Sequence, residues 1–453
     1  MRRRKFLALG LAPALALGTL TACAPGSGQG SPEGAPSKAA GDINTDPSTL
    51  GEVELKVWDQ EVRGSQNDAL EALNKAFEKK YPNIKIKRTS QSNDDLQQQI
   101  ALALSGNDVP DVAQVNNARG DMGQYVSAGQ LVNLDPYAEA YGWNDRFADS
   151  VLSKVRYSDD AKTFGEGHIY GVPQTGEIVG LFYSKKKLEK LGVKAPTTWD
   201  EYFAVLDKAK EAGEQPMVLG NLEQWPALHV FGPLQANYVT ADEIVKLGMG
   251  NKGADWTSDA NKEALTQFVK WAKEGYFGSS PNGTDYDPAW ANFGKGTGVF
   301  LPAGSWVGTD LEGTMKDDLG FMAPPPGVDG KLATTGGTGI PFSIPAKAKN
   351  VDAAAAYIDF ITSDEAMKII AEKGGMPVNN TAELAPDSGV QHDIFVAFDK
   401  VSSEGTLLPY LDYATPSFAD TAGQGLQEAL GGQKSPEDVL QSFQDDYSKF
   451  VGE

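Results

Sequence analysis

Residues 53–58 read Val-Glu-Leu-Lys-Val-Trp, and this alternation of apolar and polar side chains predicts a β-strand with one buried face. Leu70, Leu73 and Phe77 follow at helical spacing, so a helix is expected after the strand. A second strand is expected from Ile84 onward. This strand–helix–strand order is typical of α/β proteins and sets the expected fold class.

The same pattern continues along the chain. Leu96, Ile100 and Leu104 share one face of a further predicted helix, and residues 109–112, Val-Pro-Asp-Val, begin another short buried strand. The first part of the chain is therefore expected to form an α/β sheet. Such sheets bind ligands at the carboxyl ends of their strands, so polar residues that follow the strands are site candidates.

Helix-start signals predict that the second half of the chain is also α/β, with added helices. Thr198 precedes Glu201 by three residues, as in a capping box. Ser435 stands before Pro436 at the start of a predicted terminal helix. We find no internal repeat.

Composition excludes several classes of function. The chain has 453 residues, 40% of them apolar, which is enough for two or three domains and too apolar for a disordered protein. Its net charge of −21 repels phosphate backbones, so a nucleic-acid partner is not expected. No arginine follows Arg156, which argues against a polyanionic substrate held from several sides.

The N-terminus carries an export signal. Residues 2–5 are basic and residues 6–20 are mostly apolar, a stretch shorter than the roughly 20 residues of a membrane span. Cys23 follows and is the only cysteine, which excludes an internal disulfide and a cysteine-based metal site. We expect a signal peptide over residues 1–22, for the general secretory or the twin-arginine route. The next segment has almost no large apolar side chains, so a flexible linker is expected over residues 23–51.

Four loops gather aromatic side chains or glycines. They are residues 225–226, 286–290, 304–306 and 335–339. Aromatic groups in surface loops are typical of a binding face. The alternative is that each tryptophan fills the core of its own part of the molecule.

The sequence Leu-Thr-Ala-Cys at residues 20–23 resembles the bacterial lipobox. The resemblance implies that a diacylglycerol is attached to Cys23 and that the mature protein is anchored to the outer face of the cell membrane.

An ordered series of short motifs resembles the extracellular solute-binding proteins of carbohydrate ABC transporters, the family 1 sugar-binding proteins similar to maltose-binding protein. The series runs in order through residues 52–453, although each motif alone is weak. It includes Ser-Gly-Asn-Asp-Val-Pro-Asp-Val at 105–112, Ile-Tyr-Gly-Val-Pro at 169–173, Pro-Thr-Thr-Trp-Asp-Glu at 196–201, Gly-Ser-Trp at 304–306 and Ile-Pro-Ala-Lys at 344–347. Ser184 and Val299-Phe300 depart from the family pattern, which leaves the sugar specificity unassigned.

The resemblance implies a two-lobe α/β fold like that of periplasmic binding proteins (class II), with a hinge and an inter-lobe cleft. Lobe one is expected at residues 52–174 and 338–374, and lobe two at residues 175–337 and 375–453. The implied function is to capture a carbohydrate, expected to be an oligosaccharide, by lobe closure. The implied partners are the transmembrane permease subunits of an ABC importer, which receive the sugar from a monomeric binding protein.

A sugar needs acids or amides for its hydroxyl groups and aromatic planes for its C–H face. Candidates of both kinds follow the predicted strands and occupy the aromatic loops. With the resemblance, the expected ligand-binding residues are Glu61, Arg63, Asn93, Asn116, Asn117, Gln174, Glu177, Trp225, Asp285, Trp290, Ser305, Trp306, Gly336 and Gly337. Trp306 is the best single candidate because it belongs to the Gly-Ser-Trp motif. For Glu61 and Asn93, a solvated surface position is the alternative.

Other functions stay open. A lipid-anchored glycoside hydrolase also needs aromatic platforms and two carboxylates, but no acid pair stands in a recognisable catalytic setting. An adhesive protein would carry a large apolar patch in place of a cleft. A binder of a peptide, a polyamine or glycerol phosphate would share the two-lobe fold. We expect no catalytic residue, no cofactor and no metal.

Two features of the sequence are expected to carry no chemistry. His168, His229 and His392 are scattered without ligand spacing, so a surface or loop position is expected for each. The glycines at 248–253 match a dinucleotide-binding fingerprint, but they follow a predicted helix instead of a strand.

Overall fold

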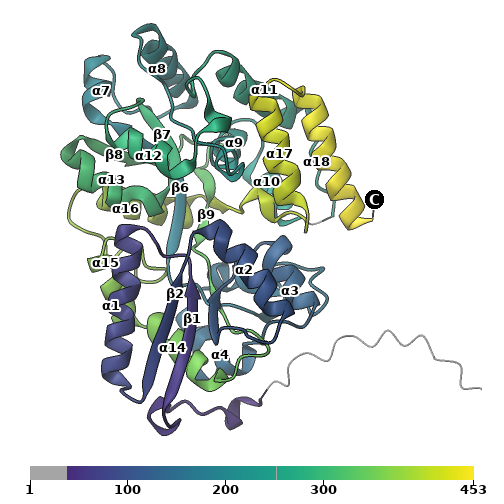
Figure 1. Cartoon of the computed structure of the whole chain (residues 1–453). Coiled ribbons are helices and arrows are strands. Elements are labelled where there is room, and N and C mark those ends of the chain that lie inside the picture. Colours follow the sequence, from purple (N-terminus) through teal and green to yellow (C-terminus); the bar gives the residue numbers. More distant parts are fainter. Residues whose placement is uncertain (1–37, 251, 453) are drawn as a thin grey trace, which may run out of the picture. The chain divides into compact units, whose positions relative to one another are not determined.

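The computed structural model describes residues 38–250 and 252–452. The first sheet takes three of its four strands from the N-terminal part of this range and the fourth from residues 342–343. Its strand order is β10-β3-β1-β2, in which β1 pairs parallel with β2 and β3 while β10 is antiparallel to β3. The strands are β1 (Val53–Asp59), β2 (Ile84–Ser90), β3 (Val112–Gln114) and β10 (Phe342–Ser343). The predicted strand–helix–strand unit is confirmed by β1, α1 (Gly64–Lys80) and β2, which follow one another in Figure 1.

Helices pack against this first sheet to form what we call the first lobe. Leu70, Leu73 and Phe77 of α1 are buried, and so are Leu96 and Ile100 of α2, as their helical spacing predicts. Its other helices are α2 (Asn93–Ser105), α3 (Gln124–Ser127), α4 (Asp135–Tyr141), α5 (Trp143–Arg146), α6 (Asp149–Leu152), α14 (Val351–Ile361) and α15 (Asp364–Glu372). A two-stranded ribbon is formed by β4 (Arg156–Tyr157) and β5 (His168–Ile169).

The second sheet is centred on one long strand, β6, and defines the second lobe. β6 pairs antiparallel with β7 and β8, and its first residues pair with β9, to which β11 adds in parallel. The strands are β6 (Gly176–Ser184), β7 (Phe300–Gly304), β8 (Leu319–Met322), β9 (Ala333–Thr338) and β11 (Thr406–Leu408). The second part of the chain is therefore α/β, as predicted.

The second lobe carries more helices than the first. They are α7 (Lys185–Lys190), α8 (Trp199–Glu211), α9 (Leu228–Gln235), α10 (Ala241–Met249), α11 (Asp259–Lys273), α12 (Tyr286–Gly294), α13 (Gly308–Met315), α16 (Val390–Glu404), α17 (Phe418–Leu430) and α18 (Pro436–Val451). Thr198 and Ser435 cap α8 and α18 through their side chains, which confirms the two helix starts expected from sequence. α17 and α18 pack side by side (Figure 1).

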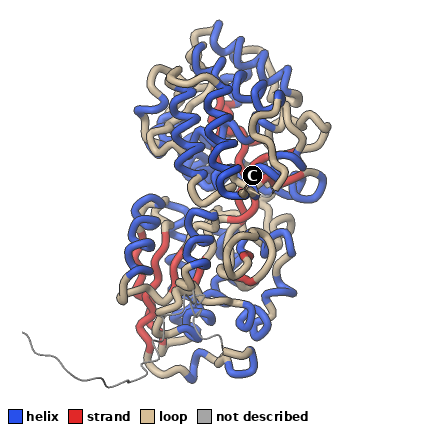
Figure 2. Tube along the Cα trace, turned by 90° about the vertical axis from the view of Figure 1, so that its right-hand side faces the viewer, coloured by secondary structure: helices blue, strands red, loops and turns tan. Residues whose placement is uncertain are grey.

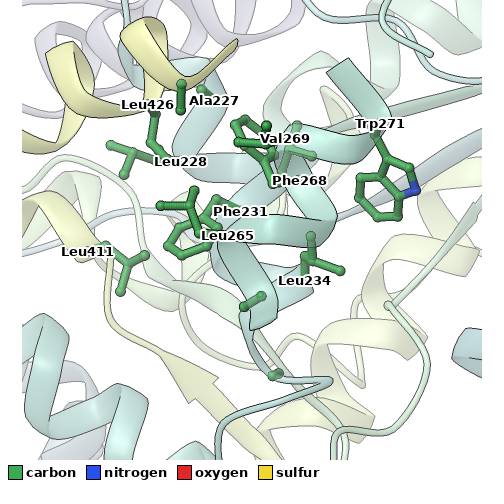
Figure 3. Packing of buried hydrophobic residues seen from close by; sticks show 14 of the residues in the cluster. Ala227, Leu228, Phe231, Leu234, Leu265, Phe268, Val269, Trp271, Leu411 and Leu426 are labelled. Atoms are coloured by element: carbon green, nitrogen blue, oxygen red, sulfur yellow. The ribbon is translucent and has the colours of Figure 1, made fainter. Parts of the chain in front are cut away.

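The largest apolar core lies in the second lobe, where helices α9, α11 and α17 meet. Phe231 and Leu234 of α9 face Leu265 and Phe268 of α11, and Leu426 of α17 lies beside them (Figure 3). All five side chains are almost fully buried. Such burial contributes about 1.5–3 kcal/mol per large side chain to the stability of the fold. These packing contacts hold helix α9, including its N-terminal end, in a fixed position.

Three stretches of chain lie side by side where the lobes are joined. Gly176 N–H donates to the carbonyl of Met376 (3.0 Å), and Phe342 N–H donates to the carbonyl of Val172 (3.0 Å). Gly339 N–H donates to the carbonyl of Thr175 (2.9 Å). The tube in Figure 2 shows strands running through this region with helix-flanked sheets on either side of it. These hydrogen bonds lie near residues 174, 338 and 375, where the chain is expected to cross from one lobe to the other. The exact positions of the lobe boundaries stay a prediction.

Residues 38–51 pack on the first lobe, which differs from the flexible linker expected up to residue 51. Ile43 is 9% exposed and belongs to the apolar core of the first lobe. Asn83 Nδ2 donates to the carbonyls of Pro47 (3.0 Å) and Gly51 (2.8 Å), and Lys38 pairs with Asp352. Composition alone missed these contacts because one apolar side chain and a few backbone carbonyls are enough to attach a short segment.

Several N-terminal predictions lie outside the described residues. They are the signal peptide, the lipidation site Cys23 and the first part of the linker. Among the helices that the structure describes, none is both long and apolar enough to cross a membrane.

Candidate functional site

A cavity of about 310 Å³ lies between residues of the two lobes. Such a volume is within the range of roughly 300–1,000 Å³ that is typical of small-molecule sites. From the first lobe the lining residues are Gln60, Arg63, Gln66, Asn93, Asp94, Gln97, Asn116, Ala118, Gly120 and Asp121. From the second lobe and the lobe junction they are Glu177, Glu223, Gln224, Trp225, Leu228, His229, Trp306, Thr338, Ile340, Tyr410, Asp412, Tyr413, Ala419 and Asp420.

The first-lobe face of the cavity is polar, and the parallel sheet explains its position. Gln60 directly follows β1 and Asn116 lies two residues after β3, so both stand at the carboxyl ends of neighbouring strands. Asn93 and Asp94 occupy the first turn of α2, which Ser92 caps by accepting a hydrogen bond from Asp95 N–H. Amide and carboxyl groups therefore gather at one edge of the first sheet.

The second-lobe face of the cavity is aromatic. Trp225 begins the turn before α9, His229 lies in α9, and Trp306 follows β7. The rings of Trp225 and Trp306 lie 5.1 and 5.3 Å from that of His229, centroid to centroid. Trp306 Nε1 donates to the hydroxyl of Tyr286 (2.9 Å), whose ring lies 4.5 Å from that of Trp225. This hydrogen bond and these ring contacts hold the indole of Trp306 in place.

A C-terminal segment completes the aromatic face. Tyr410 precedes the short helical turn η9 (Leu411–Tyr413), and its ring lies 5.8 Å from that of His229. The Tyr410 hydroxyl donates to Glu177 Oε2 (3.2 Å), and the Tyr413 hydroxyl donates to Asn117 Oδ1 (2.9 Å). The second of these bonds joins η9 to the first lobe.

Two buried carboxyls approach one another near the lobe junction. The pKa of Glu177 is raised to about 8, mainly by burial and also by the neighbouring Glu61, while the Tyr410 hydroxyl and Arg63 act in the opposite direction. Burial likewise raises the pKa of Glu61 to about 7. Gln114 Nε2 donates to Glu61 Oε1 (2.7 Å), while Glu61 Oε2 is buried and finds no hydrogen-bond partner within residues 38–250 and 252–452. Both acids can therefore hold a proton near neutral pH.

A second group of carboxyls lies where α17, η9 and the turn Arg119–Gly123 meet. Burial raises the pKa of Asp121 to about 7, and the negative charges of Asp412 and Asp420 raise it as well. Burial raises the pKa of Asp412 to about 6. In the part of the chain that the structure describes, no three His, Cys, Asp or Glu side chains are arranged to hold a metal ion.

Arg63 connects the lobes at the mouth of the cavity. Its Nη2 donates to Asp287 Oδ1 in α12 at 3.0 Å, and its guanidinium lies 5.9 Å from the centre of the Tyr286 ring. Its Nε is buried and has no hydrogen-bond partner among the residues that the structure describes. Arg63 thus contributes charge both to the cavity and to a direct contact between the lobes.

Six of the residues predicted from sequence line the cavity together. They are Arg63, Asn93, Asn116, Glu177, Trp225 and Trp306. Glu61 is buried behind them and contacts Gln114 instead of solvent, so it is not a solvated surface group.

Three of the other predicted residues have side chains that bond within the protein. Asn117 Nδ2 donates to the carbonyl of Lys154 (2.7 Å), and Gln174 Nε2 donates to the carbonyl of Ile361 (3.3 Å). Ser305 Oγ accepts from Ile178 N–H (3.2 Å). These groups position the lobe junction and the strand β6, and they do not line the cavity.

The remaining four predicted residues lie outside the cavity lining. Gly336 and Gly337 belong to β9 and pair with β6, and a Cβ on Gly336 would lie 2.6 Å from the carbonyl oxygen of Glu177. Asp285 is the exposed N-cap residue of α12. Trp290 lines a separate groove with Arg63, and its Nε1 donates to Asp287 Oδ1 (2.9 Å).

Sequence reasoning missed the whole C-terminal contribution and the histidine. Tyr410, Asp412 and Tyr413 form a Tyr-Leu-Asp-Tyr segment that combines aromatic and acidic groups, and the rule used for the other loops would have selected it. His229 was expected at a surface or in a loop, but it is 6% exposed within α9 and lines the cavity. Helix α10 does precede the glycines at 248–253, as predicted.

Comparison with known proteins agrees with this architecture. The chain is 27% identical over 316 residues to the multiple sugar-binding protein of Streptococcus mutans, covering 68% of this chain and 71% of the relative. It is 25% identical over 408 residues to a maltooligosaccharide ABC transporter solute-binding lipoprotein of Streptococcus pneumoniae, covering 86% and 87%. A solved chitin oligosaccharide binding protein superposes with a TM-score of 0.73 at 22% identity, over 87% of this chain and 98% of that one.

The structural match confirms the predicted two-lobe α/β fold of periplasmic binding proteins. In sequence, residues 63–368 match the family described as bacterial extracellular solute-binding protein. That match covers more than half of the chain. The chain therefore belongs to the bacterial extracellular solute-binding protein family.

Proposed function

We propose that this protein captures a carbohydrate outside the cytoplasm and delivers it to the permease of an ABC importer. The observation that carries the proposal is the cavity between the lobes, in which aromatic rings of the second lobe lie together with amide and carboxyl groups that both lobes contribute. Aromatic planes suit the C–H face of a sugar ring, and amide and carboxyl groups suit its hydroxyls. The names of the relatives, a multiple sugar-binding protein and a maltooligosaccharide-binding lipoprotein, support the same ligand class.

Lobe closure gives the mechanism. A ligand that contacts Asn93 on one lobe and Trp306 on the other binds the closed form better than the open form, so it shifts the population toward closure. A shift from about 1% to about 99% closed requires about 5.5 kcal/mol of differential affinity. The Arg63–Asp287 ion pair and the Tyr413–Asn117 hydrogen bond are contacts between the lobes that contribute to the same equilibrium.

The ligand contacts proposed here are the cavity-lining residues. Trp225 and Trp306 provide the platforms, and Asn93, Asn116 and Glu177 provide hydrogen bonds to hydroxyl groups. The buried groups behind them, such as Asn117 and Ser305, are proposed to keep the frame of the site rigid.

The proposed location is the outer face of the cell membrane. The Leu-Thr-Ala-Cys sequence and the lipoprotein name of the pneumococcal relative support lipid attachment at Cys23. The head is proposed to act as a monomer that presents one lobe to each of the two permease subunits. Residues 52–174 with 338–374 and residues 175–337 with 375–453 are the proposed rigid halves.

A thermal-shift panel of neutral and charged mono- and oligosaccharides, with short peptides for comparison, tests the proposal. A ligand at 100 times its dissociation constant adds about 2.7 kcal/mol to the stability of the folded state, so a true ligand raises the melting temperature clearly. Chromatography of the same sugars after incubation distinguishes a binding protein from a glycoside hydrolase. Stabilisation by a sugar that is recovered uncut supports the proposal. Stabilisation by peptides alone, or cleavage of the sugar, contradicts it.

A further inference from the structure

The lining of the cavity is strongly acidic. Six carboxyl-bearing residues line it, and among its lining residues, all of which the structure describes, Arg63 is the only lysine or arginine. Arg63 is paired with Asp287, which lies outside the lining, so its charge is already partly compensated. The six acids are Asp94, Asp121, Glu177, Glu223, Asp412 and Asp420.

These carboxyls repel one another across the cavity. Asp121 comes from the first lobe, whereas Asp412 and Asp420 come from the second, and each of the latter two disfavours the charged form of Asp121. Burial raises the pKa of Asp121, Asp412 and Glu177, because a carboxylate loses its hydration there. A cation placed among these carboxylates would reduce both their mutual repulsion and the free-energy cost of their lost hydration, because it compensates the negative charge directly.

The aromatic face contains a neutral, unpaired histidine in place of a cation. His229 is 6% exposed and lines the cavity, and its buried Nδ1 has no hydrogen-bond partner in the described part of the chain. Burial lowers the pKa of His229 to about 3, so it adds no positive charge at neutral pH. Its ring lies among those of Trp225, Trp306 and Tyr410, at 5.1, 5.3 and 5.8 Å. Aromatic faces attract cations, and the attraction is larger where water is excluded.

We propose that the ligand is a carbohydrate bearing a protonated amine, whose ammonium group binds between Asp121 and Asp412 while its ring lies against Trp225 and Trp306. This inference rests on the proposed function and narrows its substrate class to amino sugars and their oligomers. Since Asp121 and Asp412 belong to opposite lobes, an ammonium group between them also favours closure.

Calorimetry with sugar sets that differ at one position provides the first test. Cellobiose, N,N′-diacetylchitobiose and the β-1,4-linked glucosamine disaccharide carry a hydroxyl, an acetamide and an amine at C2. Glucose and galactose, each with its N-acetylamino and its amino form, give two further sets. At about pH 6.5 a sugar amine is largely protonated. We expect the amine to bind at least about tenfold more tightly than the neutral members of its set, which corresponds to about 1.4 kcal/mol.

The outcomes separate this inference from the proposed function. Equal or tighter binding of a neutral member contradicts the inference and leaves carbohydrate capture intact. Failure of every amine-bearing sugar to bind also contradicts it. Spermidine serves as a cation that is not a sugar. If spermidine binds more tightly than any amino sugar, the carbohydrate function is contradicted, whereas the recognition of a cation is supported.

Charge-removing variants provide the second test. Asp121→Asn and Asp412→Asn keep the size of the side chain, so we expect each to weaken binding of the tightest amino sugar by about tenfold and of its neutral counterpart by less than about threefold. The control is Glu211→Gln, which removes the same charge from an exposed residue of α8. We expect both Asp variants to melt no lower than the parent, because a costly buried charge is removed. Equal losses for both ligands contradict the proposal.

Discussion

The two faces of the cavity differ in chemistry and in the way the chain builds them. The first-lobe face consists of short polar side chains that follow parallel strands or begin α2, as Asn93 and Asn116 do. The second-lobe face combines acidic side chains with rings from three distant segments, and the rings are represented by Trp225, Trp306 and Tyr410. Rings bury a large area without a strict geometry, whereas amides and acids need defined partners. We therefore expect the aromatic face to set affinity and the polar face to set the choice of sugar.

The largest expected effect tests the aromatic face. Trp306→Ala removes a ring that lines the cavity, together with the hydrogen-bond partner of the Tyr286 hydroxyl. We expect affinity for the best sugar of the thermal-shift panel to fall by about tenfold or more, as measured by calorimetry, because stacking area is lost. Trp290→Ala is the matched control, since Trp290 lines only the separate groove and we expect its change to stay within about threefold. Equal losses in the two variants would contradict the contrast between the faces.

The second effect concerns the carboxyl that stands between the faces. Glu177 is faced by Glu61, Arg63 and Tyr410, and burial raises its pKa to about 8, against about 4.3 in an unfolded chain. Between these two values the folded state holds a proton that the unfolded state lacks, so this group lowers stability as the pH rises. Glu177→Gln removes that dependence.

The measurement is the melting temperature of the ligand-free protein at several pH values. We expect the variant to gain a few degrees relative to the parent between about pH 5 and pH 8.5. Tyr410→Phe, which removes only the hydroxyl bonded to Glu177, is the control. If the difference in melting temperature between variant and parent does not change with pH, the carboxyl of Glu177 is charged over the whole pH range measured.

The contrast between the faces also explains what could be predicted from the sequence. Local periodicity placed α1, α2 and the ends of β1 and β3, so the first-lobe candidates Asn93 and Asn116 followed from a rule about strand ends. Trp306 was reached through its Gly-Ser-Trp motif. Tyr410 was missed although its segment fits the rule used for the other aromatic loops, whereas its contact with Glu177, 233 positions away in the chain, is recorded by no local pattern.

Other candidates shared the right chemistry but had a different role. Asn117 and Gln174 are polar residues near strand ends, but their amide groups donate hydrogen bonds to backbone carbonyls inside the protein. Residue type and spacing cannot distinguish an amide that faces the cavity from one that faces the protein, because the difference depends on which backbone carbonyl lies within about 3 Å. The same holds for Ile43 in the predicted linker. Residue type did not reveal that this one apolar side chain packs in the core of the first lobe.

The third effect measures the polar face. Asn93→Ala removes one amide from the first turn of α2, where its Nδ2 now donates to Asp94 Oδ1 at 3.3 Å. A single neutral hydrogen bond contributes about 0.5–1.5 kcal/mol, so we expect affinity to fall by about three- to tenfold. The loss should be largest for one particular hydroxyl, which a panel of deoxy sugars identifies. Asn292→Ala, at an exposed position of α12, is the control. A uniform loss across all deoxy sugars would mean that the polar face does not select among hydroxyl groups.

The smallest effect tests the contact that joins the two faces. Asp287→Asn weakens the ion pair with Arg63, in which the Asp287 side chain is 52% exposed and solvent screens the charges. Exposed pairs contribute about 0–1 kcal/mol, so we expect calorimetry to record at most a fivefold loss of affinity, about 1 kcal/mol, that disappears at high salt. Asp285→Asn, two residues earlier and also exposed, is the control. Tighter binding by Asp287→Asn would contradict a role in closure, because it would mean that Arg63, once released from Asp287, binds the ligand itself.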